Sequence, residues 1–333
     1  MPPLDGVRVL DLTRLLPGAY ATLQLADLGA EVIKIEDPRG GDPMRGFGAR
    51  LEPSRYFETL NRGKKSVTLD LRSPDAALVL ETLLRTADVL VDSFRPSTAK
   101  RLGVDASTVR AKHPRLISVS MIGFPRNTAQ AEQAAHDINY QSLAGVLRPP
   151  RMPGPLVADI GAAMQATIAI LGALVERQRT GAGTAIDVTL ADAARAWAVF
   201  PSTDDFESAC YTLYETADGC WLALGALEEK FWRAFCDRLG RPDFIPLQHA
   251  REFDAVRAVM RSKTRDEWLA LFEGVDTCLT PVIARSADLG AEARSAKAAA
   301  ERAPALGADT DAVLAAAGVA GVERERLRAR GVL

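Results

Sequence analysis

The sequence lacks the residues and motifs that mark metal, redox or phosphate-loop chemistry. Its 333 residues include four cysteines and three histidines. The cysteines show no C-x-x-C spacing, so we expect free thiols and neither a zinc site nor a disulfide framework. The motifs G-x-G-x-x-G, G-x-x-x-x-G-K-[ST], H-E-x-x-H and G-x-S-x-G do not occur. The sequence therefore gives no support to a dinucleotide-binding protein of that motif, a P-loop NTPase, a zincin or a serine hydrolase.

Long hydrophobic runs and an excess of one charge are also missing. The formal net charge is −2 and the isoelectric point is about 6.0, which gives no basic surplus for a nucleic acid or an anionic membrane. The longest uncharged apolar stretch, residues 164–175, is short for a bilayer and predicts a buried helix. No signal-peptide pattern and no peroxisomal tripeptide is found. We expect a soluble, cytoplasmic protein with no nucleic-acid or membrane partner.

The first part of the chain alternates extended and helical patterns. Apolar segments rich in β-branched residues predict strands at 7–12, 31–35, 66–71, 88–91, 115–120 and 185–188. Helical patterns separate several of them, at 20–28, 74–86 and 160–178. This alternation favours an α/β fold with a mostly parallel sheet that helices cover on both faces.

The pattern changes near residue 195, and a chain of this length usually forms about two domains. Residues 211–215 and 220–224, joined by a turn at 217–219, predict a β-hairpin. Helices are expected at 229–239 and 265–272. We therefore predict a large α/β domain at 1–192 and a smaller α+β domain at 195–285. The alanine-rich tail, 290–333, is expected to be helical and to pack on the large domain.

Three acid–base residues remain as candidates for chemistry. His136 and Asp137 are adjacent, although a helix N-cap on a solvated surface helix would give the same pattern. Asp159 precedes the helix predicted at 160–178, whose first residues are small. A helix N-terminus holds a carboxylate ionised and offers backbone N–H groups to a developing oxyanion. The alternative for Asp159 is a simple N-cap.

Basic residues gather in two loops, at 62–65 and at 95–101. Both loops adjoin predicted strands, and loops at the carboxyl ends of parallel strands are where such sheets bind ligands. Arginine and lysine in such loops suit a polyphosphate ligand. The alternative is solvated surface charge.

Several segments together resemble the family III CoA-transferases, the superfamily that also contains α-methylacyl-CoA racemase. They are residues 6–12, 25–36, 61–71, 87–96, 114–117 and 179–183. The resemblance implies a large CoA-binding domain of Rossmann-like topology, a small domain and an intertwined homodimer. It also implies an acyl-CoA substrate, no metal and no cofactor beyond coenzyme A itself.

The resemblance further implies a set of site residues. Asp159 matches the family's catalytic aspartate, which is a nucleophile in transferases and an acid–base group in racemases. His136, followed by Asp137, resembles the racemase catalytic-histidine segment, and Glu228 matches the glutamate that orients this histidine. The residues implied for coenzyme A are Arg39, Asn61, Arg62, Gly63, Lys64, Leu69, Arg72, Ser93, Phe94, Arg95, Arg101, Leu102, Ala135 and Tyr140.

The chain departs from the family pattern after the second strand. Asp37 stands where the family has an arginine before a proline, so either Arg39 takes over that arginine's contact or the contact is lost. The glycine-rich loop of formyl-CoA transferase-like enzymes has no counterpart before Phe206. Apparent deletions elsewhere affect segments that help to shape the acyl pocket, so the acyl group stays open.

From these features we predict a 2-methylacyl-CoA racemase that works by 1,1-proton transfer through an enolate. His136, steadied by Glu228, serves one face of the α-carbon, and Asp159, coupled to Asp137, serves the other. One alternative is a CoA-transferase in which Asp159 is the nucleophile and an aspartyl-CoA thioester forms. The other is a CoA-binding protein without catalytic activity.

Overall fold

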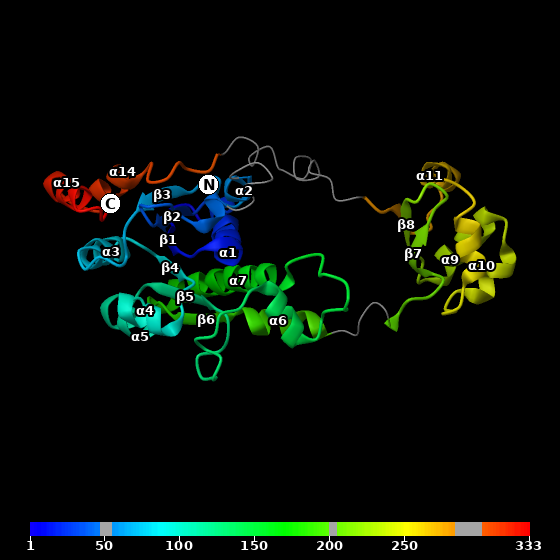
Figure 1. Cartoon of the computed structure of the whole chain (residues 1–333), viewed down its shortest axis with the longest axis horizontal. Helices are drawn as coiled ribbons and strands as arrows, with labels where there is room; N and C mark the ends of the chain where they lie inside the picture. Colours follow the sequence, from blue (N-terminus) through cyan, green and yellow to red (C-terminus); the bar gives the residue numbers. More distant parts are fainter. Residues whose placement is uncertain (47–54, 200–204, 284–301) are drawn as a thin grey trace. The chain divides into compact units, whose positions relative to one another are not determined.

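The computed structural model describes residues 1–46, 55–199, 205–283 and 302–333. The chain divides into two compact units (Figure 1). The first comprises Met1–Val199 and Ser295–Leu333, and the second comprises Phe200–Arg294. The second unit is thus inserted into the sequence of the first.

The first unit is built on a sheet of six strands. They are β1 (Arg8–Leu12), β2 (Glu31–Glu36), β3 (Lys65–Thr68), β4 (Val89–Asp92), β5 (Ile117–Ile122) and β6 (Ala185–Thr189). The spatial order is β3-β2-β1-β4-β5-β6, and every neighbouring pair is parallel. The parallel α/β sheet expected from the sequence is therefore confirmed. The chain builds outward in opposite directions from β1 and β4, so the switch point of the sheet lies between these two strands.

Helices cover both faces of this sheet (Figure 1). Successive strand residues point to opposite faces, which is why Val9 and Leu10 belong to different cores. One core contains residues of α1 (Leu15–Asp27), α6 (Asp137–Ala144), α7 (Val157–Thr180) and α8 (Leu190–Ala196). The other contains residues of α3 (Ala76–Leu84), α4 (Pro96–Leu102), α5 (Ala106–Lys112), α14 (Thr310–Ala316) and α15 (Gly321–Ala329). The short elements η1 (Pro43–Arg45), α2 (Arg55–Asn61) and η2 (Trp197–Val199) complete the unit.

Helix α1 begins five residues earlier than the sequence predicts. Its first turn includes Pro17, whose missing N–H would have no partner inside the helix at that position anyway. It also includes Gly18, where an added Cβ would lie 2.1 Å from Cβ of Thr13. A residue without a side chain thus lets the helix start directly against the end of β1.

Strand β3 ends earlier than predicted because its partner β2 ends at Glu36, and later residues of the chain take the hydrogen bonds on its outer side. The backbone N–H of Asp70 donates to the carbonyl of Val332 at 2.8 Å. Thr68 N donates to Oγ1 of Thr310, and Asp309 N donates to the carbonyl of Ser66, both at 3.0 Å. These contacts cover the free side of β3, which is an edge strand.

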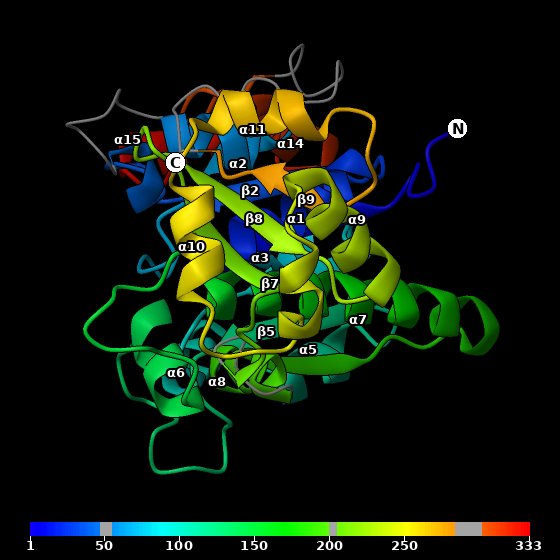
Figure 2. The same cartoon turned by 90° about the vertical axis from the view of Figure 1, so that its right-hand side faces the viewer.

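The second unit consists of a three-stranded antiparallel sheet and helices, coloured yellow-green to orange in Figure 2. The strands are β7 (Tyr211–Glu215), β8 (Trp221–Gly225) and β9 (Leu279–Pro281). The helices are α9 (Glu229–Leu239), η4 (Pro242–Leu247), α10 (Asp254–Met260) and α11 (Arg265–Phe272). Its core is aromatic, with Trp232 stacked on Phe235 and Phe235 on Phe272. The sequence predicts the hairpin, α9 and α11, and it misses β9 and α10.

Within the described residues, α7 is the one helix long and apolar enough to cross a membrane by length and composition. Half of its most apolar window is buried inside the protein. A core helix of an α/β fold has the same properties, so α7 by itself is weak evidence for a membrane span.

Candidate active site

A groove of about 660 Å³ lies at the carboxyl edge of the parallel sheet. Residues that end or follow β1 to β5 line it, and α6, α7 and α8 contribute further residues. The groove therefore includes the switch point between β1 and β4, where open α/β sheets bind their ligands. All of its lining residues belong to the first unit.

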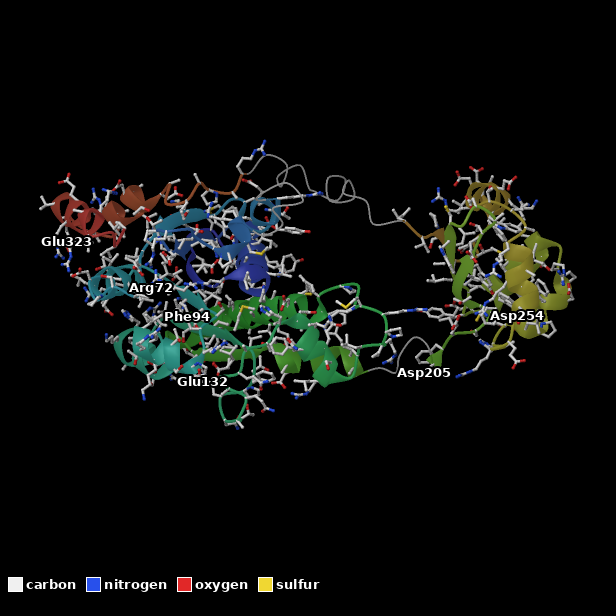
Figure 3. The ribbon with its side chains drawn as sticks, in the orientation of Figure 1. Arg72, Phe94, Glu132, Asp205, Asp254 and Glu323 are labelled. Atoms are coloured by element: carbon white, nitrogen blue, oxygen red, sulfur yellow. The ribbon has the colours of Figure 1, made fainter. Side chains whose placement is uncertain are left out.

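The groove brings together many of the residues that the sequence nominates, contributed by separate parts of the chain. Phe94 and Arg72 are labelled among the side chains of the first unit in Figure 3. The nominated residues that line the groove are Leu69, Arg72, Ser93, Phe94, Arg95, Arg101, Leu102, Ala135, His136, Tyr140 and Asp159. A candidate acid–base pair and a candidate phosphate-binding set thus share one groove.

The segment 61–64, expected to bind coenzyme A, does not line the groove. Lys64 has no exposed side-chain surface, and its Nζ donates to Ala19 O at 2.9 Å, Thr22 Oγ1 at 2.8 Å and Asn61 Oδ1 at 2.9 Å. Arg62 forms an ion pair with Asp27, and Gly63 N donates to the carbonyl of Arg302 at 3.1 Å. These side chains are occupied with packing α1 against α2 and β3. Burial lowers the pKa of the Lys64 amine to about 7.

Glu228 belongs to the second unit, where it is the N-cap of α9 and makes no side-chain capping hydrogen bond. The first unit, described by itself, contains His136 and Asp159 but not this glutamate. The expected orientation of His136 by Glu228 therefore stays a prediction.

Asp159 lies inside the first turn of α7 and not in front of the helix, because α7 begins at Val157. Burial, with a smaller effect of the neighbouring Asp137, raises the pKa of this carboxyl to about 7. The expectation of a carboxylate held ionised by the helix N-terminus is thus overturned. Near neutral pH, Asp159 is able both to accept and to donate a proton.

Asp137 caps the helix that carries Asp159. Its side chain is buried, and Oδ1 accepts from Ala158 N at 2.9 Å and from Asp159 N at 3.1 Å. Its other oxygen accepts from the side-chain amide of Gln141. Asp137 therefore accepts hydrogen bonds from two backbone N–H groups at the start of α7 that the sequence had suggested for stabilising an enolate oxygen. Its observed role is to fix the start of α7 and to add negative charge beside Asp159.

His136 is the N-cap residue of α6 and lines the groove with an exposed side chain. Its backbone N–H donates to Oδ1 of Asn139 at 3.0 Å, which fixes the start of the helix. One turn later, Tyr140 is buried edge-on against Phe124. An added Cβ on Gly123 would lie 2.5 Å from the Tyr140 hydroxyl, so glycine is needed for this packing. Burial, with a smaller effect of Asp159, raises the pKa of Tyr140 to about 12 and keeps its hydroxyl protonated.

The loop before His136 is attached to the start of α4. The carboxylate of Glu132, labelled in Figure 3, accepts from the backbone N–H and the hydroxyl of Ser97, both at 2.8 Å. Loop residues 131 and 133–135 line the groove directly. This contact links the segment carrying His136 to the segment carrying Arg95.

Two sets of charged side chains lie in or beside the groove, three exposed arginines and a set of paired aspartates and arginines. Arg14, Arg95 and Arg101 are exposed and form no ion pair with the described residues. Beside them, two Asp-x-Arg segments, 37–39 and 70–72, follow the adjacent strands β2 and β3. Each arginine pairs with its own aspartate and with the other one, at 2.7–3.0 Å. We call these four residues the Asp-Arg ring. Arg39 belongs to the ring but does not line the groove.

Sequence reasoning missed several groove residues, including Arg14, Leu15, Asp37 and Asp70. Arg14 and Leu15 lie in the first strand-to-helix turn, which in a parallel sheet always reaches the carboxyl edge. That topological signal was sufficient to nominate them. Asp37 was noticed only as a departure from a family pattern, and nothing in the sequence pairs it with Arg72.

The fold and the groove together define a class: a doubly wound α/β protein with basic residues and acid–base groups at the switch point of its sheet. The family model for CoA-transferase family III matches residues 4–303, and the chain belongs to this family. Human alpha-methylacyl-CoA racemase is 32% identical over 309 residues, covering 84% of this chain and 78% of the relative. Succinate–glutarate CoA-transferase of Agrobacterium fabrum is 36% identical over 206 residues, covering 57% and 52%.

Solved structures show the same fold. A CAIB/BAIF family protein from Brucella suis has a TM-score of 0.79 at 25% identity, covering 95% of this chain and 99% of that protein. A hypothetical protein from Mycobacterium tuberculosis has a TM-score of 0.78 at 28% identity, covering 94% and 99%. The relatives include both racemases and CoA-transferases, so family membership supports an enzyme and leaves the reaction open.

Proposed function

We propose that this protein is a 2-methylacyl-CoA racemase that moves the α-proton from one face of the thioester to the other. The observation that carries the proposal is that His136 and Asp159 line one groove, with the pKa of Asp159 raised to about 7. A two-base racemase needs each base to hold a proton in one half of the cycle and to lack it in the other. A carboxyl that is half protonated near neutral pH meets this requirement.

In the proposed reaction one base, ionised Asp159 or neutral His136, removes the α-proton. The electron pair of the broken C–H bond passes into the enolate of the thioester. The other residue, in its protonated form, then donates its proton to the opposite face of the same carbon. After one turnover the two residues have exchanged protonation states, and the reverse reaction restores them. Arg14, Arg95 and Arg101 would hold the phosphates of coenzyme A.

CoA transfer is the second candidate, and the transferases among the relatives favour it. In that reaction ionised Asp159 attacks the thioester carbonyl and coenzyme A leaves. This leaves a mixed anhydride, and the coenzyme A thiolate attacks its Asp159 carbonyl, which releases the first carboxylate and forms an aspartyl-CoA thioester. The acceptor carboxylate attacks this thioester, and the freed thiolate then attacks the acceptor's carbonyl in the new anhydride, which gives the new acyl-CoA and restores Asp159. A nucleophile must be ionised to attack, and with a pKa of about 7 roughly half of Asp159 is ionised at neutral pH, so this route needs only one of its two protonation states. The same pKa supports proton transfer.

One experiment separates these candidates. The protein is incubated with 2-methylacyl-CoA in deuterated water, with and without an acceptor carboxylate. We expect α-deuteration that does not depend on the acceptor. Acceptor-dependent thioester exchange would establish a transferase instead, and coenzyme A binding without either reaction would establish a CoA-binding protein. Hydroxylamine trapping followed by mass spectrometry of the peptide with Asp159 provides a check, because the racemase route forms no acyl-aspartate.

Proton transfer among a carboxyl, an imidazole and carbon requires no further group. We therefore propose coenzyme A, as part of the substrate, as the only cofactor. We also propose the cytoplasm as the site of action.

We propose further that the chain works as a homodimer. An apolar stripe on α7 supports this, since Met164, Ile168 and Val175 are 45%, 68% and 62% exposed and recur at helical spacing.

The dimer is tested by placing a charge in the centre of this stripe. We expect Ile168→Asp to shift the protein from dimer to monomer in sedimentation velocity, because a buried unpaired carboxylate opposes association. Glu176→Gln, an exposed change on the same helix, is the control. A wild-type protein that sediments as a monomer would refute the dimer.

A further inference from the structure

The turn between β1 and α1 contains a backbone conformation that is unusual for its residue. Leu15 has φ of +63°, and within the described residues only Cys278 is another non-glycine residue with positive φ. The left-handed region crowds the Cβ of an L-residue, and leucine seldom adopts it. Leu15 lines the groove beside Arg14 and Pro17. Strained residues persist only where the surrounding contacts fix them, and they cluster at functional sites.

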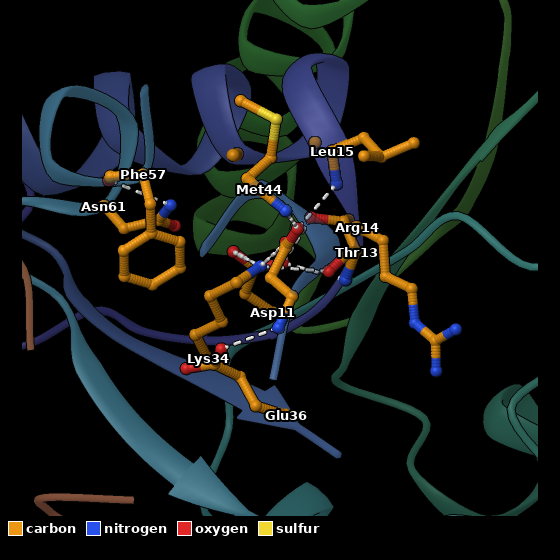
Figure 4. Close-up of polar contacts among 12 residues, drawn as sticks. Asp11, Thr13, Arg14, Leu15, Lys34, Glu36, Met44, Phe57 and Asn61 are labelled. Atoms are coloured by element: carbon orange, nitrogen blue, oxygen red, sulfur yellow. Dashed lines mark hydrogen bonds and ion pairs between the residues drawn. The ribbon is translucent and has the colours of Figure 1, made fainter. Parts of the chain in front are cut away.

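Side chains from three different parts of the chain fix this turn. Asp42 accepts from Leu15 N at 3.3 Å, and Lys34 Nζ donates to Thr13 O at 3.0 Å. Ser93, which follows β4, accepts from Arg14 N at 3.1 Å. Three consecutive residues of the turn are thus each held by a backbone hydrogen bond to a side chain (Figure 4 labels the turn residues and Lys34).

The two ionic groups among these holders form one buried pair. Lys34 Nζ lies 2.9 Å from Asp42 Oδ2, and the side chains are 0% and 1% exposed. Asp11 lies 4.0 Å from Lys34 and accepts from both the N–H and the hydroxyl of Thr13. A buried ion pair is a weak source of stability, because desolvation offsets its attraction, and an apolar pair of the same volume often serves folding as well. Its distinctive contribution here is that it dictates one conformation of the turn.

The position of the turn indicates what it contacts. In the sheet order β3-β2-β1-β4-β5-β6, β1 lies between the strands that carry the Asp-Arg ring and those that lead to His136 and Asp159. Arg14, which is proposed above to hold a phosphate, precedes Leu15 directly, and His136 lines the same groove. A thioester that reaches from Arg14 to His136 therefore passes this turn. Leu15 also packs against the apolar cluster of Met44 and Phe57, so its side chain has a fixed backing.

We propose that Asp42, together with Lys34, is a positioning residue that keeps Leu15 left-handed and so builds the wall for the acyl end of the substrate. This inference rests on the proposed function for the identity of the ligand, an acyl-CoA. Asp42 touches no substrate in this scheme and acts through the backbone of Leu15. Arg95 and Arg101, which follow β4 outside this turn, are also proposed to hold the phosphates, so the wall affects the acyl part of the ligand more than coenzyme A itself.

The test is a double-mutant cycle with Asp42→Asn and Leu15→Gly. Glycine adopts positive φ without strain, so the need for Asp42 falls when residue 15 is glycine. Affinities are measured for coenzyme A and for a non-reactive 2-methylacyl-CoA thioether, and the α-deuteration rate is followed in parallel. In the leucine background we expect D42N to weaken thioether binding about tenfold, with coenzyme A binding changed less than about twofold. In the glycine background D42N should weaken thioether binding less than about threefold.

An equal loss in both backgrounds would overturn the inference, because a residue that only stabilises the fold acts regardless of residue 15. The double variant K34M/D42L removes the acceptor of Leu15 N together with both charges of the pair, so it gives the same cycle in case D42N does not fold, and the same coupling to residue 15 is expected. The thioether arm is independent of the reaction catalysed. A wild-type protein that binds the thioether but exchanges no α-proton would refute the racemase proposal and leave this inference to be decided by the cycle.

Discussion

Two clusters of alternating charge in the first unit differ in their exposure to water. The first, Asp11, Lys34, Asp42 and Lys64, is buried beneath the turn at Leu15. The second is the Asp-Arg ring, in which Arg39 and Arg72 are both 59% exposed. Attraction between charges is much stronger where water is excluded, and so is the penalty for an unpaired charge. The buried cluster therefore fixes geometry, whereas the ring is able to exchange its partners for those of a ligand.

The largest difference between the clusters should appear in stability. Lys34→Met leaves Asp11 and Asp42 buried without their shared partner, which costs about 3–5 kcal/mol. The matched change in the ring, Arg39→Met, should leave the urea midpoint unchanged, since Arg39 is solvated. Equal urea midpoints for the two variants would show that the buried cluster and the Asp-Arg ring do not differ in their contribution to stability. The double variant K34M/D42L should recover stability but not thioether affinity.

Asp159 is intermediate between the two clusters, half-buried and beside a second carboxylate. Removing an acid–base group costs about 100-fold or more in rate, so Asp159→Asn should reduce α-deuteration at least that much. Its pKa is higher in the folded than in the unfolded chain, so stability falls as pH rises from about 4 through 7. D159N should therefore melt at a higher temperature than wild type at pH 8, and the difference should vanish at pH 4. A variant with full exchange activity, or with no pH-dependent difference, would contradict this assignment.

A smaller effect is expected on coenzyme A affinity when Arg101, an exposed cation in the groove, and Lys64, a buried cation, are each replaced. Arg101→Ala should weaken coenzyme A binding about tenfold, since a charge-assisted hydrogen bond contributes roughly 1.5–3 kcal/mol. Lys64→Met should change the affinity little and lower the stability instead, because its amine is enclosed by protein groups. Calorimetric titration at fixed salt measures both affinities. If Lys64→Met weakened coenzyme A binding and Arg101→Ala did not, Lys64 would belong to the binding site.

The smallest effect concerns the ring aspartate that replaces a family arginine. Asp37 competes with a phosphate for Arg39 and Arg72, so Asp37→Asn should strengthen coenzyme A binding roughly two- to fivefold. The gain should shrink at high salt, where exposed charges are screened. Asp27→Asn, which breaks the pair with Arg62 outside the groove, is the control. Weaker binding by D37N would mean that the carboxylate itself contacts the ligand.

Much of this architecture could be predicted from the sequence. The parallel sheet follows from apolar segments at regular spacing, and α9 and α11 occupy the residues that their patterns predict. Chemistry was harder to predict, because it depends on burial. Asp159 in sequence is a carboxylate at a helix start, yet desolvation and Asp137 raise its pKa. The sequence shows Lys64 only as one basic residue in a basic loop, yet in the structure its amine is buried among protein groups. Neither outcome follows from the local pattern, since Asp137 lies 22 positions from Asp159, and Ala19 and Thr22 lie 45 and 42 positions from Lys64.

The covering of β3 by α14 and the residues around Val332 has a consequence for the order of folding. Ser66 and Asp309, which hydrogen-bond to each other, are separated by 243 positions in the sequence. During synthesis β3 is made early, and its partners on the outer side emerge only after the whole second unit. Until then β3 presents an unpaired edge to other nascent chains. The second unit has its own local hairpin and aromatic core, so it is able to fold while the first unit waits. Closing so long a loop slows the last step of folding, and an interrupted chain would expose this edge to aggregation.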